Sequence, residues 1–294
     1  MPTEPLVTLI VVPRERWSCA RESLDDLRRN TPPGYELVYV DGGAPPEVRE
    51  WLAGTAREGD FRLLRTDDHL SPNAARNRGL GEARGRYVVF VDNEVLVKPG
   101  WLDALVACAE ETGAALVQPL CCIGEMADGI IHMAGGALRI EARRSGRVLV
   151  ETHPFWNEPV ARVPGGLRRG PTDYVEFHCV LARRAVLDAF GPLDEELLSV
   201  AEHVDLSLKV REAGHSIWFE PAAHVTHLAT RPLAPSDLPY FNLRWSDEWT
   251  ERSLRRLAAR WDLDPRSPSI VGVARFAAIR REIFPLRPHA APAI

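Results

Sequence analysis

The sequence predicts an α/β fold in which helices flank a mostly parallel central sheet. Short runs rich in β-branched residues alternate with helical patterns through residues 1–120. Such alternation is typical of parallel sheets with helical crossovers. After Pro239 the apolar residues follow a helical spacing only. We therefore expect a Rossmann-like half at the N-terminus and a helical extension at the C-terminus.

The N-terminal half is predicted to contain five strands and four helices. The strands are Val7–Val12, Glu36–Val40, Phe61–Leu64, Tyr87–Val91 and Ala115–Leu120. The helices are Cys19–Asn30, Pro46–Arg57, Pro72–Ala83 and Trp101–Glu111. Ser71 is a good N-cap and Pro72 fits a first helical turn, so together they mark the start of the third helix. Gly113 is expected to end the fourth.

The middle of the chain is less regular. From Met126 to Thr172 the periodicity fades and Gly, Pro and Arg become frequent, which predicts a loop-rich segment containing a hairpin. Regular structure is then expected to return as strand Tyr174–Ala182, helices Arg183–Phe190 and Glu202–Ala213, strand Ser216–Phe219, and a second sheet edge at Ala223–Leu228.

The C-terminal helices each carry an apolar stripe. The first stripe contains Leu254, Leu257, Ala258 and Trp261, and the second contains Val271, Phe276, Ile279 and Ile283. Packing on the main domain explains both stripes. A contact in an oligomer or with a membrane surface, to which the Arg-rich polar faces are suited, is the alternative. We expect one α/β domain over residues 1–235, divided at 120/121, and a helical extension over residues 236–294.

Composition excludes several classes of protein. A chain of 294 residues with 45% hydrophobic and 26% charged residues is ordinary for a globular protein. The net charge is −5 and the arginines are dispersed among acidic residues, so no nucleic-acid partner is expected. Five cysteines without CxxC spacing lie mostly in apolar segments, which indicates buried free thiols in a reducing compartment rather than a zinc ribbon.

Membrane and targeting segments are also not expected. The apolar run near the N-terminus has about seven residues and no basic region before it, which fits a first strand better than a signal peptide. No stretch approaches the roughly 20 apolar residues of a spanning helix. We therefore expect a cytoplasmic location, with any membrane contact being peripheral.

An acidic motif follows the apolar strand Tyr87–Val91. Asp92-Asn93-Glu94 would lie at the carboxyl end of a parallel strand, where α/β sheets bind ligands. Two carboxylates two residues apart can point to the same side and hold a divalent cation, and a cation there can neutralise a diphosphate. For such a motif on its own, a solvated acidic turn is the alternative.

The segment before this strand reads Ser71-Pro-Asn-Ala-Ala-Arg-Asn-Arg-Gly79. A helix of this type, a small turn and a strand ending in an acidic motif together resemble the family 2 GT-A glycosyltransferases. Three more segments fit the resemblance, which covers roughly residues 7–230: Val7–Arg14, Val40–Gly43 and Asp194–Leu228. The resemblance implies a GT-A fold and sugar transfer from a nucleoside-diphosphate sugar to an acceptor hydroxyl. It also implies inversion at the sugar, Mn²⁺ or Mg²⁺ as cofactor, a donor-binding half over residues 1–120 and an acceptor-binding half over residues 121–235.

The resemblance also implies roles for individual residues. Pro13 and Arg14 would adjoin the nucleotide, Arg76 would contact the nucleotide or its pyrophosphate, and Asn93 would lie with them at the donor. Asp92, Glu94 and His227 would be the metal ligands, with His224 as a competitor of His227; Glu94 stands where Asp is commoner in the family. Mixed carboxylate and imidazole ligation suits Mn²⁺ or Mg²⁺.

Asp41 is the candidate for reading the base. A carboxylate at the end of a strand can accept the imide N–H of uracil or thymine, which favours UDP as the nucleotide and leaves dTDP open. The alternative is that Asp41 serves an Asx-turn before Gly42 and Gly43.

The catalytic base is expected at the start of the helix Glu202–Ala213. The resemblance implies an acidic pair here, but His203 occupies the second acidic position. Glu202, His203 and Asp205 could each take a proton near neutral pH. Glu202 and Asp205 share a helix face, and His203 is rotated about 100° from Glu202. We rank Glu202 above His203 and expect Asp205 to orient or cap; an acidic first turn favoured by the helix dipole is the alternative.

Two other functions compete with this one. A GT-A-like domain that has lost its base, with His203 as the trace of that loss, would bind nucleotide sugar or a partner without turnover. A sugar-1-phosphate nucleotidyltransferase should carry a Gly- and Arg-rich loop after the first strand, and Val12–Arg16 lacks the glycines. The acceptor is left open among saccharide, lipid-linked glycan, protein and small natural product. Trp156 could stack on a sugar ring, and Arg244 could face the diphosphate from a lid, although core packing of Trp245 and Trp249 is favoured.

Overall fold

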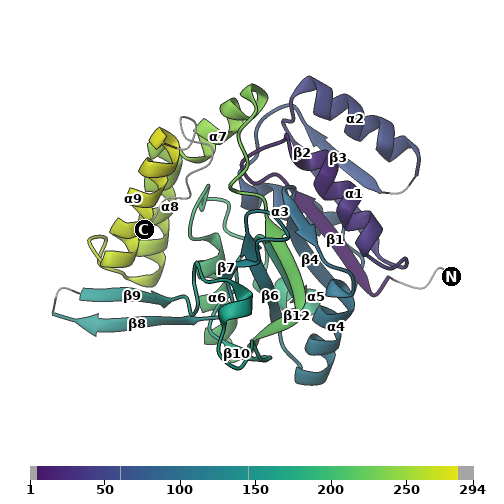
Figure 1. Ribbon diagram of the computed structural model, residues 1–294. Helices are drawn as coiled ribbons and strands as arrows, with labels where there is room; N and C mark the ends of the chain where they lie inside the picture. The colour runs from purple at the N-terminus through teal and green to yellow at the C-terminus, as the bar shows by residue number, and fades with distance from the viewer. Residues whose placement is uncertain (1–4, 60, 145, 284–294) are drawn as a thin grey trace.

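The computed structural model describes residues 5–59, 61–144 and 146–283, which form a ten-stranded mixed sheet and a separate hairpin (Figure 1). The first four strands run parallel to one another and are joined by three helices. The strands are β1 (Val7–Val12), β2 (Glu36–Gly42), β3 (Arg62–Thr66) and β4 (Tyr87–Asp92). The helices are α1 (Ala20–Asn30), α2 (Pro46–Arg57) and α3 (Pro72–Glu82).

The second half of the sheet is mixed. Its strands are β5 (Val95–Val97), β6 (Leu116–Ile123), β7 (Ile130–Met133), β10 (Gly170–Thr172), β11 (Cys179–Arg183) and β12 (Ile217–His227). Its helices are α4 (Trp101–Thr112), α5 (Arg184–Phe190) and α6 (Glu202–Glu212), with the short 3-10 turn η1 (Val160–Arg162). The main path of the sheet runs β10-β12-β6-β11-β4-β1-β2-β3.

Strand direction determines which residues meet at one edge of the sheet. β11 runs antiparallel to both β4 and β6, and β12 runs parallel to β6. The strands β1, β2, β4 and β12 therefore all end at the same edge, and β11 begins there. Residues far apart in the sequence, from Pro13 to His227, are brought to this edge.

Alternate side chains of the strands build two cores. Leu9 and Val11 of β1 pack in the core that contains Leu24 of α1 and Leu105 of α4. Ile10 and Val12 point to the other face, with side chains from α3, α5 and α6. Because both faces are covered, the strands read as continuous apolar runs rather than as alternating ones.

Most predicted elements of the first 120 residues are confirmed within three residues at each end, and α2 and β1 match at both ends. The Ser71 hydroxyl accepts a hydrogen bond from Ala74 N, and Gly113 follows α4 with a φ of 70°. The expected hairpin in the middle segment is β8 (Ala137–Arg143) with β9 (Gly146–Thr152). All five cysteines are buried and free, as predicted.

Two strand predictions in the second half are wrong. The strand expected at Tyr174–Ala182 begins only at Cys179, because the backbone N–H groups of Val175 and Glu176 donate to the side chains of Ser207 and Gln118. The two strands expected at 216–219 and 223–228 are one strand, β12, with an irregular register between Glu220 and His224. β12 lies between β6 and β10 and is not an edge strand.

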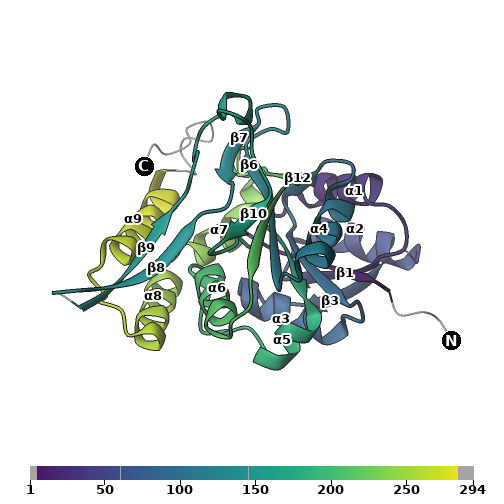
Figure 2. The same cartoon turned by 90° about the horizontal axis from the view of Figure 1, so that it is seen from below.

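The C-terminal helices are α7 (Leu238–Arg244), α8 (Asp247–Trp261) and α9 (Pro268–Ile283), preceded by the 3-10 turn η2 (Pro235–Asp237). Figures 1 and 2 show α8 and α9 beside the β8–β9 hairpin, at the opposite end of the molecule from α1 and α2. The predicted stripe of α8 is buried in the main core, which confirms the packing interpretation. The α9 stripe is wrong at Val271, which is 51% exposed, because Ile270 and Ala277 set the buried face.

No helix among the described residues combines the length and the apolar character needed to cross a membrane. The division of the chain at residues 120/121 and 235/236 stays a prediction.

Candidate functional site

Glu94 and His227 meet at the sheet edge defined above. β5 pairs with β12 so that Val95 faces His227, and Leu228 N donates to Glu94 O. This pairing brings His227 Nε2 to 2.8 Å from Glu94 Oε1. Both side chains are buried, and burial raises the pKa of Glu94 to about 8 and lowers that of His227 to about 3. The sequence prediction that these two residues act together thus has a geometric basis.

Glu15 joins this pair, a residue that the sequence analysis did not select. Glu15, Glu94 and His227 each offer one potential ligand atom, and these three atoms lie within 4.8 Å of one another. Glu15 accepts from Trp245 Nε1 at 2.9 Å and pairs with Arg16 and Arg280. Burial alone would raise the pKa of Glu15, but Arg280 and Arg16 outweigh it and hold the pKa below its usual range.

Asp92 has different partners from Glu94. Its Oδ2 lies 2.9 Å from His178 Nδ1 and 3.6 Å from Arg14 Nε, and its Oδ1 lies 3.5 Å from Arg76 Nη2. Burial would raise the pKa of Asp92, but the hydrogen bond from His178 and the nearby arginines lower it to about 2. Asp92 is therefore a carboxylate held in a cationic setting.

Asn93 fixes the loop that follows β1. Its Oδ1 accepts from Arg14 N at 3.1 Å, and its Nδ2 donates to Arg16 O at 2.9 Å. Pro13 and Arg14 begin this loop, so the acidic motif and the end of β1 form one rigid unit. The contacts give Asn93 a role in positioning Arg14, in addition to any contact with a ligand.

Asp41 lies fully buried near the end of β2. Its Oδ1 accepts from Ala44 N at 2.8 Å, which is the turn role foreseen as an alternative. Its Oδ2 has no hydrogen-bond partner among the described residues. One oxygen thus serves the turn, and the other is free to accept a hydrogen bond from a ligand.

Glu202 lies between two buried arginines. Its Oε1 is 3.9 Å from both Arg76 Nη1 and Arg244 Nη1, and it has no hydrogen-bond partner in the described part of the chain. Arg76 also stacks its guanidinium 3.8 Å from the ring centroid of Phe177. Burial lowers the pKa of Arg76 to about 10 and also lowers that of Arg244. Glu202 therefore balances cationic charge as well as lining the site.

His203 and Asp205 point to different surroundings. His203 Nε2 lies 3.4 Å from Glu176 Oε1, and the side chain is 19% exposed. Asp205 accepts from Trp261 Nε1 at 2.9 Å and pairs with Arg260 at 3.0 Å, so it ties α6 to α8. A cavity at the sheet edge is lined by His178 and His227 among other residues. Of the three candidate bases, Glu202 and His203 also line this cavity, and Asp205 does not.

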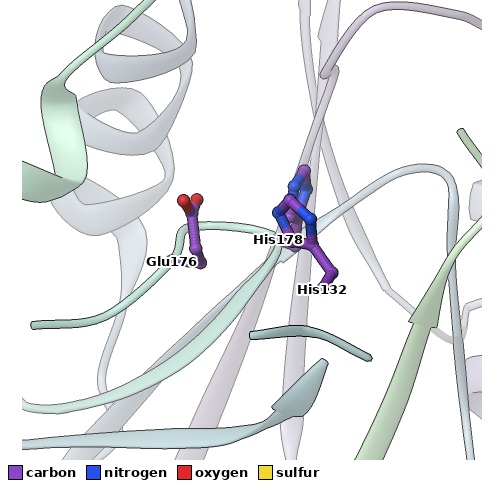
Figure 3. A group of neighbouring side chains, drawn as sticks. All are labelled: His132, Glu176 and His178. Atoms are coloured by element: carbon purple, nitrogen blue, oxygen red, sulfur yellow. The ribbon is translucent and has the colours of Figure 1, made fainter. Parts of the chain in front are cut away.

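A second cluster lies beside the first. His132, Glu176 and His178 place one ligand atom each within 4.8 Å of one another. In Figure 3 the two imidazole rings overlap in the view, and the Glu176 side chain lies to their left. The ring of His178 also stacks on that of His227, with centroids 3.9 Å apart. Sequence reasoning missed Glu176 and His178 because it placed them inside a strand. They lie just before β11, whose antiparallel direction brings them to this edge of the sheet.

His224, the competitor of His227, lies three residues earlier on β12. It is absent from both potential metal-binding groups found among the described residues. Burial lowers its pKa to about 4, and its backbone carbonyl accepts from Lys98 N. The geometry thus separates the two histidines and favours His227.

Comparison with known proteins identifies the family. The family model described as "Glycosyl transferase family 2" matches residues 8–190. The pre-mycofactocin glycosyltransferase of Mycobacterium tuberculosis is 28% identical over 228 residues, which are 77% of this chain and 43% of that protein. The O-antigen biosynthesis protein RfbC of Myxococcus xanthus is 27% identical over 293 residues, covering 86% of this chain and 21% of that protein. The chain thus spans less than half the length of these relatives.

Solved structures show the same fold at low sequence identity. GalNAc-T7, crystallised with UDP, GalNAc and Mn²⁺, matches 96% of this chain and 57% of its own with a TM-score of 0.60 and 18% identity. The mannosyltransferase PcManGT of Pyrobaculum calidifontis, in complex with GDP-Man and Mn²⁺, matches 96% of this chain and 71% of its own with a TM-score of 0.56 and 16% identity. The chain therefore belongs to glycosyl transferase family 2, a family of enzymes, and has the GT-A fold.

Proposed function

We propose that the protein transfers a sugar from a nucleoside-diphosphate sugar to an acceptor hydroxyl, with inversion and with a divalent cation as cofactor. The observation that carries the proposal is the cluster of Glu15, Glu94 and His227 at the sheet edge where β4 ends in Asp92. Near the end of β2, Asp41 keeps one carboxylate oxygen without a hydrogen-bond partner among the described residues. This edge is where α/β sheets bind their ligands. The two solved neighbours with this fold, each titled with Mn²⁺ and a nucleotide, support the same assignment.

The residues present fit Mn²⁺ or Mg²⁺. His227 is buried and its Nδ1 has no hydrogen-bond partner within the described residues, and Glu94 and Glu15 supply carboxylate oxygens beside it. Carboxylate with imidazole is a donor set that Mn²⁺ accepts, while Mg²⁺ prefers oxygen. When bound, the cation would neutralise charge on the departing diphosphate. Asp92, Glu94 and His227 remain our candidates for holding it, with Glu15 added.

Asp41 supports a preference for uridine. Its free Oδ2 can accept the imide N–H of uracil, and thymine offers the same group, so UDP is favoured and dTDP remains an alternative. Burial raises the pKa of Asp41 because it disfavours the charged carboxylate. A hydrogen bond from the base N–H to the second oxygen would stabilise that carboxylate.

Three arginines are suited to the diphosphate. Arg76 and Arg244 are buried and Arg14 is partly buried, all near Asp92 or Glu202, and the nitrogens of Arg244 have no hydrogen-bond partner in the described part of the chain. Burial of a guanidinium without hydrogen bonds destabilises the fold unless an anion accepts hydrogen bonds from it. The lid role foreseen for Arg244 and the core packing of Trp245 are thus compatible, since Trp245 packs against Phe276 while Arg244 faces Glu202.

The geometry favours His203 as the base, with Glu176 as its positioning residue. Glu202 is committed to Arg76 and Arg244, whereas His203 lines the cavity and has a carboxylate 3.4 Å from its Nε2. In the step we propose, the acceptor oxygen bonds to C1 of the sugar as the bond from C1 to the diphosphate oxygen breaks. The hydroxyl proton passes to His203, and the nucleoside diphosphate leaves with the electron pair of the broken bond. Attack from the opposite face inverts the anomeric carbon.

Calorimetric titration with UDP-, dTDP- and GDP-sugars, with and without Mn²⁺, tests the donor assignment. We expect one nucleotide class to bind in the presence of Mn²⁺, and we expect Asp92→Ala to lose that binding. Absence of binding by every nucleotide sugar would remove the basis of the proposal. Product with the donor's anomeric configuration would contradict the inverting mechanism and leave the transferase assignment intact.

A further inference from the structure

A cavity in two parts lies between the sheet edge and the C-terminal helices. Its inner part is bounded by Glu176, His178, Glu202 and His203, and its outer part opens beside Trp156. The two parts share lining residues from β9 and α9, so they adjoin. The outer part has a volume of about 560 Å³, which lies in the range of roughly 300–1,000 Å³ typical of small-molecule sites.

The walls of this cavity away from the catalytic end are apolar. They come from β9, α8 and α9, and the side chains are Leu149, Leu254, Leu257, Ile270, Val273 and Phe276. The Ser269 hydroxyl donates to Leu149 O at 2.6 Å, which fixes the start of α9 against β9. Figure 2 shows α9 lying along the β8–β9 hairpin, so this wall is formed by the C-terminal extension and the hairpin together. An apolar body placed here would be removed from water on several sides.

Charge beside His203 disfavours an anionic acceptor. The carboxyl groups of Glu151, Glu176 and Glu202 line the cavity. Burial raises the pKa of Glu151, and Glu202 is flanked by Arg76 and Arg244, so the carboxylate that opposes an anion is that of Glu176, 3.4 Å from His203. Burial lowers the pKa of His153, so this ring adds no positive charge. Arg280 pairs with Glu15, and Arg14, which the proposed function assigns to the donor diphosphate, lies 3.6 Å from Asp92. An acceptor phosphate beside His203 would meet this like charge at short range.

We propose that the acceptor is an uncharged alcohol or phenol with an apolar body, which occupies the cavity between β9, α8 and α9 and presents its hydroxyl to His203. This inference rests on the proposed function and names its acceptor class. It separates such acceptors from lipid phosphates and from phosphorylated sugars, whose charge the Glu176 carboxylate beside His203 opposes.

The probes are 2-naphthol and 2-naphthyl phosphate, which share a ring system and differ in charge. Each is titrated calorimetrically into the whole chain, and UDP with Mn²⁺ is titrated in parallel. The wild-type protein is expected to bind 2-naphthol at least about tenfold more tightly than 2-naphthyl phosphate.

Variants on α9 locate the binding. Val273→Arg places a charge in the cavity wall, and Val271→Arg is its matched control because Val271 is exposed on the same helix. Gly272→Trp is a second variant, since a Cβ at Gly272 meets no atom within 4 Å and the residue lines the outer part. Val273→Arg and Gly272→Trp are expected to weaken 2-naphthol binding at least about tenfold, and Val271→Arg to leave it unchanged.

The outcomes are distinguishable. If 2-naphthyl phosphate binds as well as 2-naphthol, or if Val271→Arg weakens 2-naphthol binding as much as Val273→Arg does, the acceptor inference is overturned. UDP binding that persists in that case leaves the proposed function standing. Binding of 2-naphthol without any binding of nucleotide or nucleotide sugar would instead count against the proposed function.

Discussion

His227 and Glu94 are 133 residues apart in the chain, and their side chains meet with Nε2 of His227 at 2.8 Å from Oε1 of Glu94. The contact exists because β12 runs parallel to β6 and pairs at its end with the short strand β5. A carboxylate and an imidazole are thereby held together before any ligand arrives. Such preorganisation is what a metal site requires of its protein ligands.

The first prediction concerns His227. His227→Ala is expected to weaken Mn²⁺ binding by at least about tenfold, because the variant lacks an imidazole donor. His224→Ala on the same strand is the matched control and is expected to leave Mn²⁺ binding unchanged. Titration of Mn²⁺ in the presence of UDP measures both. Equal losses in the two variants would show a general effect on β12 instead of ligation.

The second prediction separates the candidate bases. His203→Ala is expected to lower kcat by about 10²- to 10⁴-fold while UDP affinity stays the same, because the ring takes a proton only during transfer. Glu176→Gln, which keeps the shape of the side chain, is expected to give a smaller loss of kcat. Steady-state kinetics beside UDP titrations distinguish kcat from binding. A variant Glu202→Gln that loses kcat while His203→Ala keeps it would transfer the role to Glu202.

The positions of helices and strands along the chain could be predicted from the sequence only where local patterns are strong. Apolar runs and caps such as Ser71 located the elements of the first half, because each signal lies within a few residues of the element it marks. The start of β11 could not be found in this way. Val175 and Glu176 satisfy their N–H groups with Ser207 and Gln118, which are distant in the sequence.

The site residues also divide into those that the sequence could identify and those that only the fold brings together. Asp92, Glu94 and His227 could be selected because the resemblance fixed their places in the order of motifs. Glu15, Glu176 and His178 belong to no such motif, and only the antiparallel direction of β11 and the fold of the loop after β1 bring them to the sheet edge. Glu202 faces Arg76 and Arg244, whereas His203 faces Glu176. These directions likewise depend on how α6 packs in the fold.

The third prediction concerns the attachment of α8. Asp194 accepts from Arg256 and Arg260 of this helix, and its backbone carbonyl accepts from Asn73. Burial would raise the pKa of Asp194, but Arg256, Arg260 and the backbone N–H of Glu196 lower it in the folded state. The stabilisation is therefore full above the ordinary carboxyl pKa and is lost as the pH falls through the lower folded value.

Asp194→Asn is expected to reduce the free energy of unfolding by about 1.5–3 kcal/mol at neutral pH, since hydrogen bonds to a charged group are lost. The difference from wild type is expected to shrink as the pH is lowered toward about 3. Urea unfolding at several pH values measures this difference. Glu251→Gln, which removes an exposed ion pair with Arg255, is the control and is expected to change the free energy of unfolding little. A difference that is constant with pH would contradict a charge-based role.

The fourth prediction concerns Arg244. Arg244 is buried, lies 3.9 Å from Glu202 Oε1 and has three guanidinium nitrogens without a hydrogen-bond partner among the described residues. If these nitrogens serve the diphosphate, Arg244→Met should weaken UDP binding by at least about tenfold, since charge-assisted hydrogen bonds are lost. The free energy of unfolding without ligand should stay unchanged or rise, because Met needs no polar partner.

Arg255→Met on α8 is the control, since its side chain is 69% exposed and should leave UDP binding unchanged. Calorimetry with UDP and urea unfolding without it give the two readouts for each variant. Loss of stability with unchanged UDP affinity in Arg244→Met would mean that Arg244 serves to neutralise Glu202 in the folded chain. Loss of affinity with retained stability would assign the guanidinium to the donor, and α7 would then be the segment that carries a cation to the diphosphate.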